Sequence, residues 1–224
     1  MKPSLTENAT LSAEEISAAR TFVDNGTLMY THAQIPLAAE DWQQLETLLQ
    51  GLAYDHVVGG DAAEAHSVRV CRFFNDVENP EALHPRSAQL HNLVMSPKMR
   101  RFYRRFTGSE NLCLRRCQAN LMQAGDFIGI HKDQDSNPDY IATVVFHFAD
   151  DYLGGDFVTH DERSGAQHFH PGAHTMLVNN CTIPHEVAPV EQGSRLTLAC
   201  FLSTEFGPSR NTRKAFEVAN RPAT

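Results

Sequence analysis

The first half of the chain alternates between helical and extended patterns of apolar residues. Apolar side chains that recur every three or four positions indicate an amphipathic helix, whereas strict alternation indicates a strand. In the first helix we expect Ile16, Ala19 and Val23 to share the buried face. The predicted elements are a helix over residues 12–25, an extended segment over 28–36, a helix over 38–50, a strand over 67–74, and a helical stretch over 85–106 with a break near Ser96 and Pro97.

The second half consists of short apolar runs separated by glycine, asparagine, aspartate and proline. Evenly spaced runs bounded by turn residues are typical of a sandwich or a jelly roll. The predicted strands cover residues 111–123, 141–149, 156–160, 167–169, 174–178, 186–190 and 195–203. We therefore expect an α+β protein with a mainly β core, supported by N-terminal helices.

No linker, repeat or low-complexity segment divides the chain of 224 residues. A chain of this length buries an adequate core as one domain. Within a single domain over 1–224, we expect helical support roughly over residues 1–110, a jelly-roll core roughly over 111–206 and a polar tail over 207–224.

Net charge, apolar runs and cysteine content limit the partners and the location expected for this protein. The formal net charge of −8 disfavours binding to the phosphate backbone of a nucleic acid. The most basic stretch, residues 100–105 with Arg115 and Arg116, is short and is interpreted as a solvated helix face. The chain has no apolar run that could cross a membrane, no apolar signal core near its start, and five cysteines without a CxxC pair. These features predict a cytoplasmic protein with reduced thiols and with neither a membrane nor a nucleic acid as partner.

A histidine and an aspartate one residue apart, with a distant second histidine, form a candidate metal site. His131 and Asp133 project to the same side if the chain is extended there, because side chains alternate along a strand. His185 follows 54 residues after His131, which is enough chain for several strands to return it to the same place. Two imidazoles and one carboxylate make up the facial triad that leaves open positions on Fe(II). Because the chain has 12 histidines, the phrase around His185 carries more weight than the first pair alone.

That phrase, residues 185–197, also contains a candidate anion grip. Gly193 and Ser194 predict a turn between two strands, after which Arg195 and Thr197 share one face of the second strand. A guanidinium and a hydroxyl at the mouth of a barrel can hold a carboxylate. A buried arginine in an otherwise apolar strand is costly without an anionic partner, and that partner is either a ligand or an acidic residue of the protein.

These phrases resemble the Fe(II)- and 2-oxoglutarate-dependent oxygenases, particularly their prolyl-4-hydroxylase-like branch. The matching phrases are His131-Lys132-Asp133, the segment 151–157 with its paired glycines, and the pattern HxxxPVxxGxRxT over 185–197. The resemblance covers roughly residues 112–203. It implies a double-stranded β-helix, which is a jelly roll, together with Fe(II), 2-oxoglutarate and O2.

The resemblance also implies roles for individual residues. The residues implied for iron binding and catalysis are His131, Asp133 and His185. Those implied for 2-oxoglutarate binding are Arg195 and Thr197 and, with a looser match, Asn120 and Gln118. The carboxylate of Asp133 favours a hydroxylase, because halogenases of the family have a small residue there. The nucleic-acid demethylase branch has a second arginine six positions after the first, and Phe201 stands at that position here.

The predicted reaction is hydroxylation of an unactivated C–H bond in a small molecule, with a free amino acid or a related metabolite as the expected substrate. The grounds are a compact single domain, an acidic balance and no peptide-binding module. Two alternatives stay open, namely a prolyl-type hydroxylase of protein side chains and a non-catalytic metal-binding or sensor protein on the same fold. Desaturation and ring closure would use the same residues as hydroxylation.

Other polar residues have plainer interpretations. His168, His170 and His174 suggest a cupin-like metal cluster, but no glutamate follows at a suitable spacing. Asp135 and Asp139 suggest either a rim that binds a substrate ammonium or a solvated loop, and the solvated loop is the preferred interpretation.

Overall fold

The structure is a computed structural model that describes residues 17, 19–20, 22–24, 26–60, 64–161 and 165–210. The predicted helix over 12–25 lies partly outside these residues, and those of its residues that are described are helical. In this helix Phe22 is 4% exposed and packs on Phe106 at 5.5 Å between ring centroids, whereas Val23 is 61% exposed. The prediction that Val23 lies on the buried face is therefore wrong, because the aromatic ring one position earlier occupies it.

The helices that follow are η1, a 3-10 turn (His32–Gln34), α2 (Ala39–Leu49), α3 (Ser87–Val94), α4 (Pro97–Thr107) and the short α5 (Asp133–Ser136). Helices α2, α3 and α4 form where the apolar spacing predicts them, whereas η1 and α5 were not predicted. Pro97 is the first residue of α4, so the predicted break is confirmed. The extended segment predicted over 28–36 is wrong in its second part, where η1 follows the first strand. None of the helices in the described part of the chain is long and apolar enough to cross a membrane.

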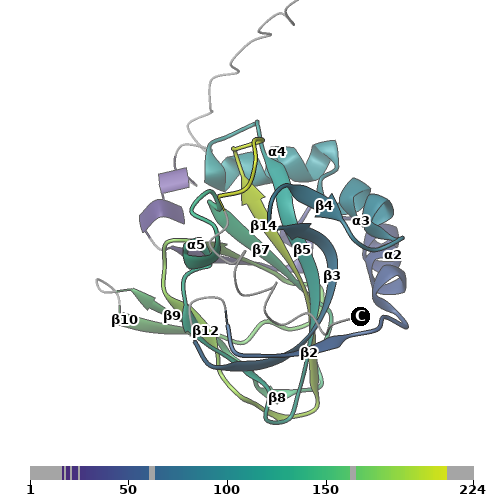
Figure 1. Cartoon of the computed structure of the whole chain (residues 1–224), viewed down its shortest axis with the longest axis vertical. Helices are drawn as coiled ribbons and strands as arrows, with labels where there is room; N and C mark the ends of the chain where they lie inside the picture. Colours follow the sequence, from purple (N-terminus) through teal and green to yellow (C-terminus); the bar gives the residue numbers. More distant parts are fainter. Residues whose placement is uncertain are drawn as a thin grey trace, which may run out of the picture.

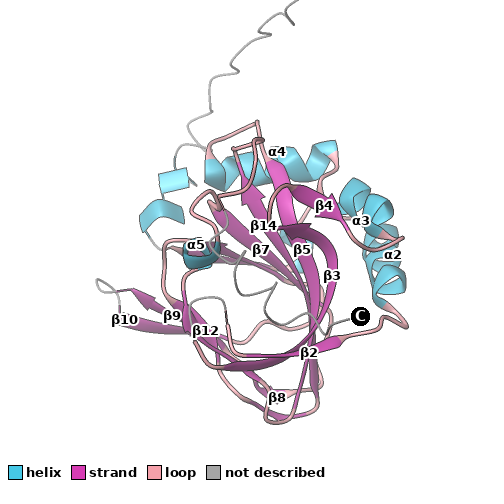
Figure 2. Ribbon diagram, in the orientation of Figure 1, coloured by secondary structure: helices cyan, strands magenta, loops and turns pink. Residues whose placement is uncertain are grey.

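Most strands belong to one large curled sheet (Figures 1 and 2). Its strands are β1 (Thr27–Tyr30), β2 (Asp55–Val58), β3 (His66–Asp76), β4 (Pro80–Ala82), β5 (Cys113–Gln123), β6 (Phe127–His131), β7 (Ala142–His147), β9 (Phe157–Asp161), β10 (Gly165–Phe169), β11 (Met176–Asn180), β12 (His185–Val187) and β14 (Ser194–Ser203). The hydrogen-bonded order is β1-β11-β7-β14-β5-β3-β6-β12-β9-β10, with β2 and β4 paired to β3. A separate pair consists of β8 (Leu153–Gly154) and β13 (Val190–Gln192).

The order of the strands confirms the predicted jelly roll with supporting helices. The sheet curls so that β6, β12 and β9 lie opposite β7, β14 and β5, while α2, α3 and α4 cover the outer side of the second group (Figure 1). The strand predicted over 186–190 is divided into β12 and β13, since the chain turns at Ala188 and Pro189. The sheet also contains β3, which precedes the predicted start of the core near residue 111.

Strict alternation along the central strands separates the core from a cavity. Along β14 the residues that pack with the helices are Leu198, Cys200 and Leu202, and those that line the cavity are Arg195, Thr197, Ala199 and Phe201. The neighbouring β5 repeats this division, with Cys117 and Ala119 on the core side. The same strands therefore build the core and position the side chains of the cavity.

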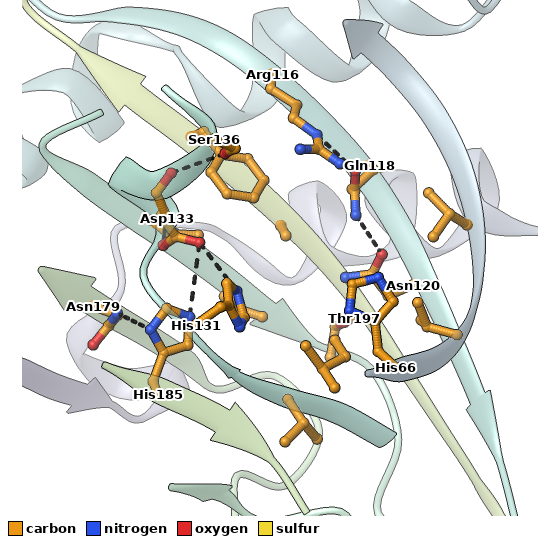
Figure 3. A pocket seen from close by; sticks show the side chains of 18 of the residues that line it. His66, Arg116, Gln118, Asn120, His131, Asp133, Ser136, Asn179, His185 and Thr197 are labelled. Carbon is orange, nitrogen blue, oxygen red and sulfur yellow. Dashed lines mark hydrogen bonds and ion pairs between the residues drawn. The ribbon is translucent and has the colours of Figure 1, made fainter. Parts of the chain in front are cut away.

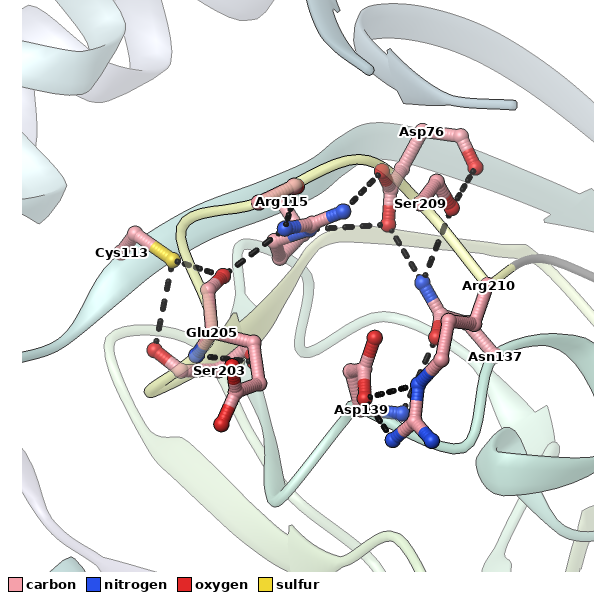
Figure 4. Close-up of polar contacts among 10 residues, drawn as sticks. Asp76, Cys113, Arg115, Asn137, Asp139, Ser203, Glu205, Ser209 and Arg210 are labelled. Carbon is pink, nitrogen blue, oxygen red and sulfur yellow. Dashed lines mark hydrogen bonds and ion pairs between the residues drawn. The ribbon is translucent and has the colours of Figure 1, made fainter. Parts of the chain in front are cut away.

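A buried ion pair joins β3 and β5 to the segment after β14 (Figure 4). Arg115 and Asp76 are both 0% exposed. The guanidinium donates hydrogen bonds of 2.9 and 3.2 Å to the Asp76 carboxylate, and two of 2.8 Å to the backbone carbonyls of Glu205 and Gly207. Asp76 also accepts a hydrogen bond of 2.7 Å from Asn137 Nδ2, in the loop after α5. We call these five residues the Arg115 network.

The start of the predicted polar tail packs against this network. The Ser209 hydroxyl donates to the backbone oxygen of Asp76 at 3.2 Å and accepts from Asn137 Nδ2 at 3.1 Å. Arg210 pairs with Asp139, which is 6% exposed (Figure 4). The expectation that Asp139 lies in a solvated loop is therefore wrong, because this ion pair covers it.

Candidate functional site

The three predicted metal ligands converge from three elements at the wall of one cavity (Figure 3). His131 ends β6, Asp133 begins α5 and His185 begins β12. His131 and His185 are register partners in the antiparallel pair of β6 and β12, which places their side chains on the same face. One ligand atom from each of the three residues lies within 4.8 Å of the other two. The arrangement matches the donor set of a 2-His-1-carboxylate site for divalent iron.

Asp133 reaches this site by a different route from the predicted one. The chain leaves the extended conformation after Lys132 and turns into α5 at Asp133. Even so, Asp133 Oδ1 lies 3.6 Å from His131 Nε2 and 3.7 Å from His185 Nε2. The other carboxylate oxygen accepts a hydrogen bond of 2.5 Å from the Thr143 hydroxyl. Asp133 is therefore oriented by the first turn of α5 and by β7, rather than by strand alternation.

Hydrogen bonds orient the two imidazoles for metal binding. His131 Nδ1 lies 2.9 Å from the backbone oxygen of Gly129, and His185 Nδ1 lies 2.9 Å from that of Ile183 and 3.1 Å from Asn179 Nδ2. A carbonyl oxygen only accepts, so the proton of a neutral ring stays on Nδ1 and the lone pair is on Nε2. Both Nε2 atoms face the Asp133 carboxylate, where a metal ion would be shared.

The ionisation of the three ligands follows from their mutual contacts. Burial acts to lower the pKa of His131, but the hydrogen bond and charge of Asp133 outweigh it and raise that pKa to about 9. Burial acts to raise the pKa of Asp133, but the charge of His185 and the hydrogen bond of His131 lower it to about 2. Burial lowers the pKa of His185. Asp133 is therefore ionised and His185 neutral at neutral pH, and a bound cation would displace a proton from His131.

A second polar group includes Arg195 and Thr197 of β14, which line the cavity, and His147 of the adjacent β7. Arg195, Thr197 and His147 are 2%, 0% and 1% exposed. Thr197 and His147 are register partners, so their side chains share one face of the sheet. Arg195 Nε, Thr197 Oγ1 and His147 Nε2 are buried without a hydrogen-bond partner in the described structure. Three orphaned polar atoms in one place indicate a site for a hydrogen-bonding ligand.

The charge at this end of the cavity suits an anion. Burial lowers the pKa of Arg195, an effect that the neighbouring Tyr152 phenol and Asp156 carboxylate oppose. Among the described residues, no carboxylate oxygen lies within 4.0 Å of the Arg195 guanidinium nitrogens, which is the limit for an ion pair. Burial and the charge of Arg195 hold the pKa of His147 well below its ordinary value. A cation and a hydroxyl thus line this end of the cavity, with a neutral imidazole on the adjacent strand, an arrangement that fits the distal carboxylate of 2-oxoglutarate.

A ladder of hydrogen bonds runs along β5 between the ends of the cavity. Arg116 Nε donates to Gln118 Oε1 at 2.8 Å, and Gln118 Nε2 donates to Asn120 Oδ1 at 2.8 Å (Figure 3). Because each amide oxygen is already an acceptor, the Asn120 amide nitrogen is the group left to donate toward a ligand. Asn120 is the register partner of Thr197 and lies on the same wall.

All seven predicted site residues line the same open cavity. They are His131, Asp133, His185, Arg195, Thr197, Asn120 and Gln118. The sequence analysis missed Arg72, Arg116, Thr143 and His147. Alternation along β5 could have revealed Arg116, since it stands two positions before Gln118 on the same face. Its interpretation as part of a solvated helix face is wrong, because Arg115 and Arg116 lie on a strand and are 0% and 8% exposed.

The alternative histidine cluster does not assemble. His168 and His170 contact Asp156, while His174 contacts Glu46 on α2. Among the described residues, the group of three or more His, Cys, Asp or Glu side chains with ligand atoms close enough to share a metal ion consists of His131, Asp133 and His185.

Comparison with a family of known sequences supports the same chemistry. The profile of the 2OG-Fe(II) oxygenase superfamily matches residues 117–203. This range runs from β5 to the end of β14 and includes all seven predicted site residues. No curated protein matches the chain significantly.

Solved structures show the extent of the likeness. An oxidoreductase of the 2OG-Fe(II) oxygenase family from Burkholderia pseudomallei is 30% identical with a TM-score of 0.80, and the match covers 91% of this chain and 97% of that one. A prolyl-4-hydroxylase from Pseudomonas putida is 15% identical with a TM-score of 0.60, covering 84% and 98%. HygX from Streptomyces hygroscopicus, solved with nickel and 2-oxoglutarate, is 12% identical with a TM-score of 0.59, covering 87% of each chain. The last two likenesses show the shared fold.

Proposed function

The chain belongs to the 2OG-Fe(II) oxygenase superfamily, and from this premise we propose that it hydroxylates an unactivated C–H bond of a small molecule. The family uses Fe(II), 2-oxoglutarate and O2. The observation that carries the proposal is that one cavity contains both a 2-His-1-carboxylate set and a buried guanidinium without an acidic partner in the described structure. A non-catalytic metal-binding protein would need the first feature and not the second.

Each residue of the site has a proposed task. His131, Asp133 and His185 hold Fe(II), and the hydrogen bonds to Gly129, Ile183 and Thr143 keep their donor atoms aimed at it. Fe(II) with 2-oxoglutarate and O2 supplies the oxidising power, with succinate and CO2 as the products of the cosubstrate.

The remaining residues orient the cosubstrate. Arg195 and Thr197 bind its distal carboxylate, and neutral His147 donates a third hydrogen bond from Nε2. Asn120, held by Gln118, donates from its amide nitrogen along the same wall. Phe157 stacks on His185 at 5.1 Å between ring centroids and excludes water from that side. The shared effect is to fix the reacting groups before a substrate enters.

An anaerobic titration tests the assignment. Fe(II) and then 2-oxoglutarate are added to the purified protein, and the visible metal-to-ligand charge-transfer band is recorded. We expect the band in the wild type and its loss in His185→Ala, because two ligands do not complete the site. His168→Ala, outside the cavity, serves as the matched control and should retain the band. Iron binding without any band in the wild type would contradict the oxygenase proposal and favour a metal-binding or sensor protein.

The main alternative substrate is a protein side chain, as in the Pseudomonas putida prolyl-4-hydroxylase. Substrate-dependent formation of succinate from 2-oxoglutarate separates the two cases. A panel of free amino acids and related metabolites is compared with a panel of proline-containing peptides. Turnover with peptides alone would replace the small-molecule proposal by the protein side-chain alternative.

A further inference from the structure

The two oxygens of the Asp133 carboxylate have different partners. Oδ1 faces the imidazoles of the triad, 3.6 Å from His131 Nε2 and 3.7 Å from His185 Nε2 (Figure 3). Oδ2 accepts a hydrogen bond of 2.5 Å from the Thr143 hydroxyl. Asp133 is 4% exposed and Thr143 is 5% exposed, so little water competes for either oxygen. One oxygen is therefore presented to a metal ion, while the other is engaged by the protein.

Thr143 is placed by the central part of the sheet. It lies on β7, where its register partners are Asn179 on β11 and Phe201 on β14. A β-branched side chain has few rotamers, so the direction of the hydroxyl follows from the backbone of the strand. Three hydrogen-bonded strands thus hold this hydroxyl against Asp133, and no loop has to close for the contact to form.

A cysteine supports the threonine from behind. The Cys181 sulfur lies 3.3 Å from Thr143 Oγ1, and Cys181 is 0% exposed. A threonine hydroxyl has one proton, and an ionised carboxylate only accepts, so this proton lies in the bond to Asp133. A buried thiol beside a carboxylate stays neutral, because a second negative charge there would be costly. The thiol therefore donates to Thr143, and the hydrogen bonds run in one direction from Cys181 through Thr143 to Asp133.

The surroundings strengthen this chain of hydrogen bonds. Cys181 belongs to a small apolar cluster, whose other buried members are Tyr140, Ala199 and Phe201. Successive hydrogen bonds in such an environment polarise one another, and a bond to an ionised acceptor is among the strong ones. The backbone oxygen of Cys181 also accepts from the Gln134 N–H at 3.3 Å, which ties α5 to the same segment. Rotation of the Asp133 carboxylate would break a strong bond that nothing in this apolar cluster replaces.

The number of carboxylate oxygens on a metal decides how much of its coordination sphere stays open. Two imidazoles and one oxygen leave room for both a chelating cosubstrate and O2. A carboxylate that binds through both of its oxygens occupies one of those positions. The orientation of Asp133 therefore matters for ligand binding as well as for metal binding.

We propose that Thr143, supported by Cys181, keeps Asp133 Oδ2 off the metal, so that the carboxylate binds through Oδ1 alone and the adjacent position stays open. Thr143 and Cys181 are positioning residues, since they act through Asp133. The inference rests on the proposed function, because it presumes a metal ion at the triad. It gives a buried threonine and a buried cysteine a role in how many ligands the metal can accept.

The experiment counts the water molecules on the metal. Mn(II), which oxygen and nitrogen ligands bind and which is stable in air, is added to the protein, and water-proton relaxation measures the exchanging waters. Thr143→Val keeps the shape of the side chain and removes the hydroxyl. We expect about one water fewer in this variant than in the wild type, because the second carboxylate oxygen takes its place. Thr143→Ser retains the hydroxyl and should keep the wild-type number.

The second readout is the affinity for 2-oxoglutarate, measured by the charge-transfer band of the anaerobic Fe(II) protein. In Thr143→Val it should fall on the order of 10-fold, at the lower end of the effects of partners of metal ligands. Cys181→Ala should give a smaller loss in the same direction, and Cys181→Ser, which retains a donor, should resemble the wild type. The matched control is Thr107→Val, which removes a hydroxyl bonded at 2.9 Å to the Tyr103 carbonyl in α4 and should change neither readout.

The two proposals fail in different ways. Absence of the charge-transfer band in the wild type contradicts the oxygenase assignment itself. A normal wild-type band, with the same number of waters and the same cosubstrate affinity in Thr143→Val, overturns the role of Thr143. Weaker Mn(II) binding with an unchanged number of waters also overturns it, since Thr143 would then only orient Asp133. If circular dichroism shows that Thr143→Val is unfolded, Cys181→Ala is compared with Cys181→Ser, and equal values for both readouts overturn the proposal.

Discussion

Two arginines on neighbouring strands, Arg115 and Arg195, are both withdrawn from solvent, at 0% and 2% exposure, yet their surroundings differ. The Arg115 guanidinium donates four hydrogen bonds, two of them to the equally buried Asp76. Arg195 has a buried Nε without a hydrogen-bond partner in the described structure, and its Nη1 donates to the Met122 sulfur at 3.7 Å. The hydrogen-bonding groups of Arg115 are satisfied within the protein, whereas those of Arg195 leave Nε available for a ligand.

The comparison of Arg115 with Arg195 distinguishes a buried charge that stabilises the fold from a buried charge that is available to bind a ligand. A satisfied pair such as Arg115 and Asp76 fixes one arrangement of the chain, here the loop after α5, the helix that begins at Asp133. An unsatisfied cation costs folding free energy and recovers it when an anion binds. Removing the first should therefore damage the fold, and removing the second should damage ligand binding.

The largest expected effect is on the fold. Arg115→Met leaves Asp76 as an uncompensated buried charge and should lower the free energy of unfolding by about 3–5 kcal/mol. Urea denaturation followed by circular dichroism measures the loss, with Arg101→Met as the exposed control. A loss below about 1 kcal/mol would remove the distinction between the two arginines.

The reciprocal variant is Arg195→Met. It should raise the KM for 2-oxoglutarate on the order of 100-fold, because the lost contact is buried and bidentate. The free energy of unfolding should change by less than about 1 kcal/mol, since no ion pair of the described structure is broken. Steady-state kinetics and urea denaturation on the same preparation give both numbers. Strong destabilisation with an unchanged KM would assign Arg195 to the fold.

A smaller effect tests whether His147 Nε2 binds the cosubstrate together with Arg195 and Thr197. His147→Phe removes the buried Nε2 and keeps an aromatic ring, so the KM for 2-oxoglutarate should rise about tenfold. Binding of Fe(II) alone should remain unchanged, because His147 is not part of the triad. Anaerobic titration of the metal and of the cosubstrate checks the two halves separately. An unchanged cosubstrate affinity would limit the anion grip to Arg195 and Thr197.

The smallest effect comes from an ion pair at the surface. Asp41 accepts a hydrogen bond of 2.7 Å from the Ala38 backbone N–H at the start of α2 and pairs with Lys98. Burial acts to raise the pKa of Asp41, but these two contacts outweigh it and lower that pKa. Because the folded-state pKa is depressed, the stabilisation is present above the unfolded value of about 3.9 and is lost as the pH falls through the folded value.

Asp41→Asn should therefore reduce stability by about 0.5 kcal/mol at pH 7, in line with a partly exposed pair. The difference from the wild type should vanish once the pH falls below the depressed pKa of folded Asp41, where this carboxyl is protonated in both states. Urea denaturation across this pH range measures the convergence. A difference that persists in acid would show that the charge of Asp41 is irrelevant to its effect.

The parts of the site that the sequence predicted are those with a local pattern. His131 and Asp133 are one residue apart, and Arg195 and Thr197 belong to one phrase with His185, so their chemistry is recognisable without knowledge of the sheet. The strands were predicted for the same reason, since alternation is a local property. Even here the mechanism of placement differed, because Asp133 begins a helix rather than continuing a strand.

The missed residues depend on strand order and register. Arg72 becomes part of the site because β3 inserts between β5 and β6, and His147 because β7 pairs with β14. Neither pairing has a local signal in the chain. Arg115 and Arg116 illustrate the limit, since two adjacent arginines suggested a solvated surface while alternation sends one into the Arg115 network and the other into the cavity.

The alternation along β14 also constrains how this protein can change over evolutionary time. Deletion or insertion of one residue within that strand would exchange every core side chain with a cavity side chain beyond that point. Such a change would lose the packing and the anion grip in one step. The shape of the cavity can therefore change through point substitutions at lining positions such as Ala199 and Phe201, whereas changes of length are confined to the turns at the ends of the strand.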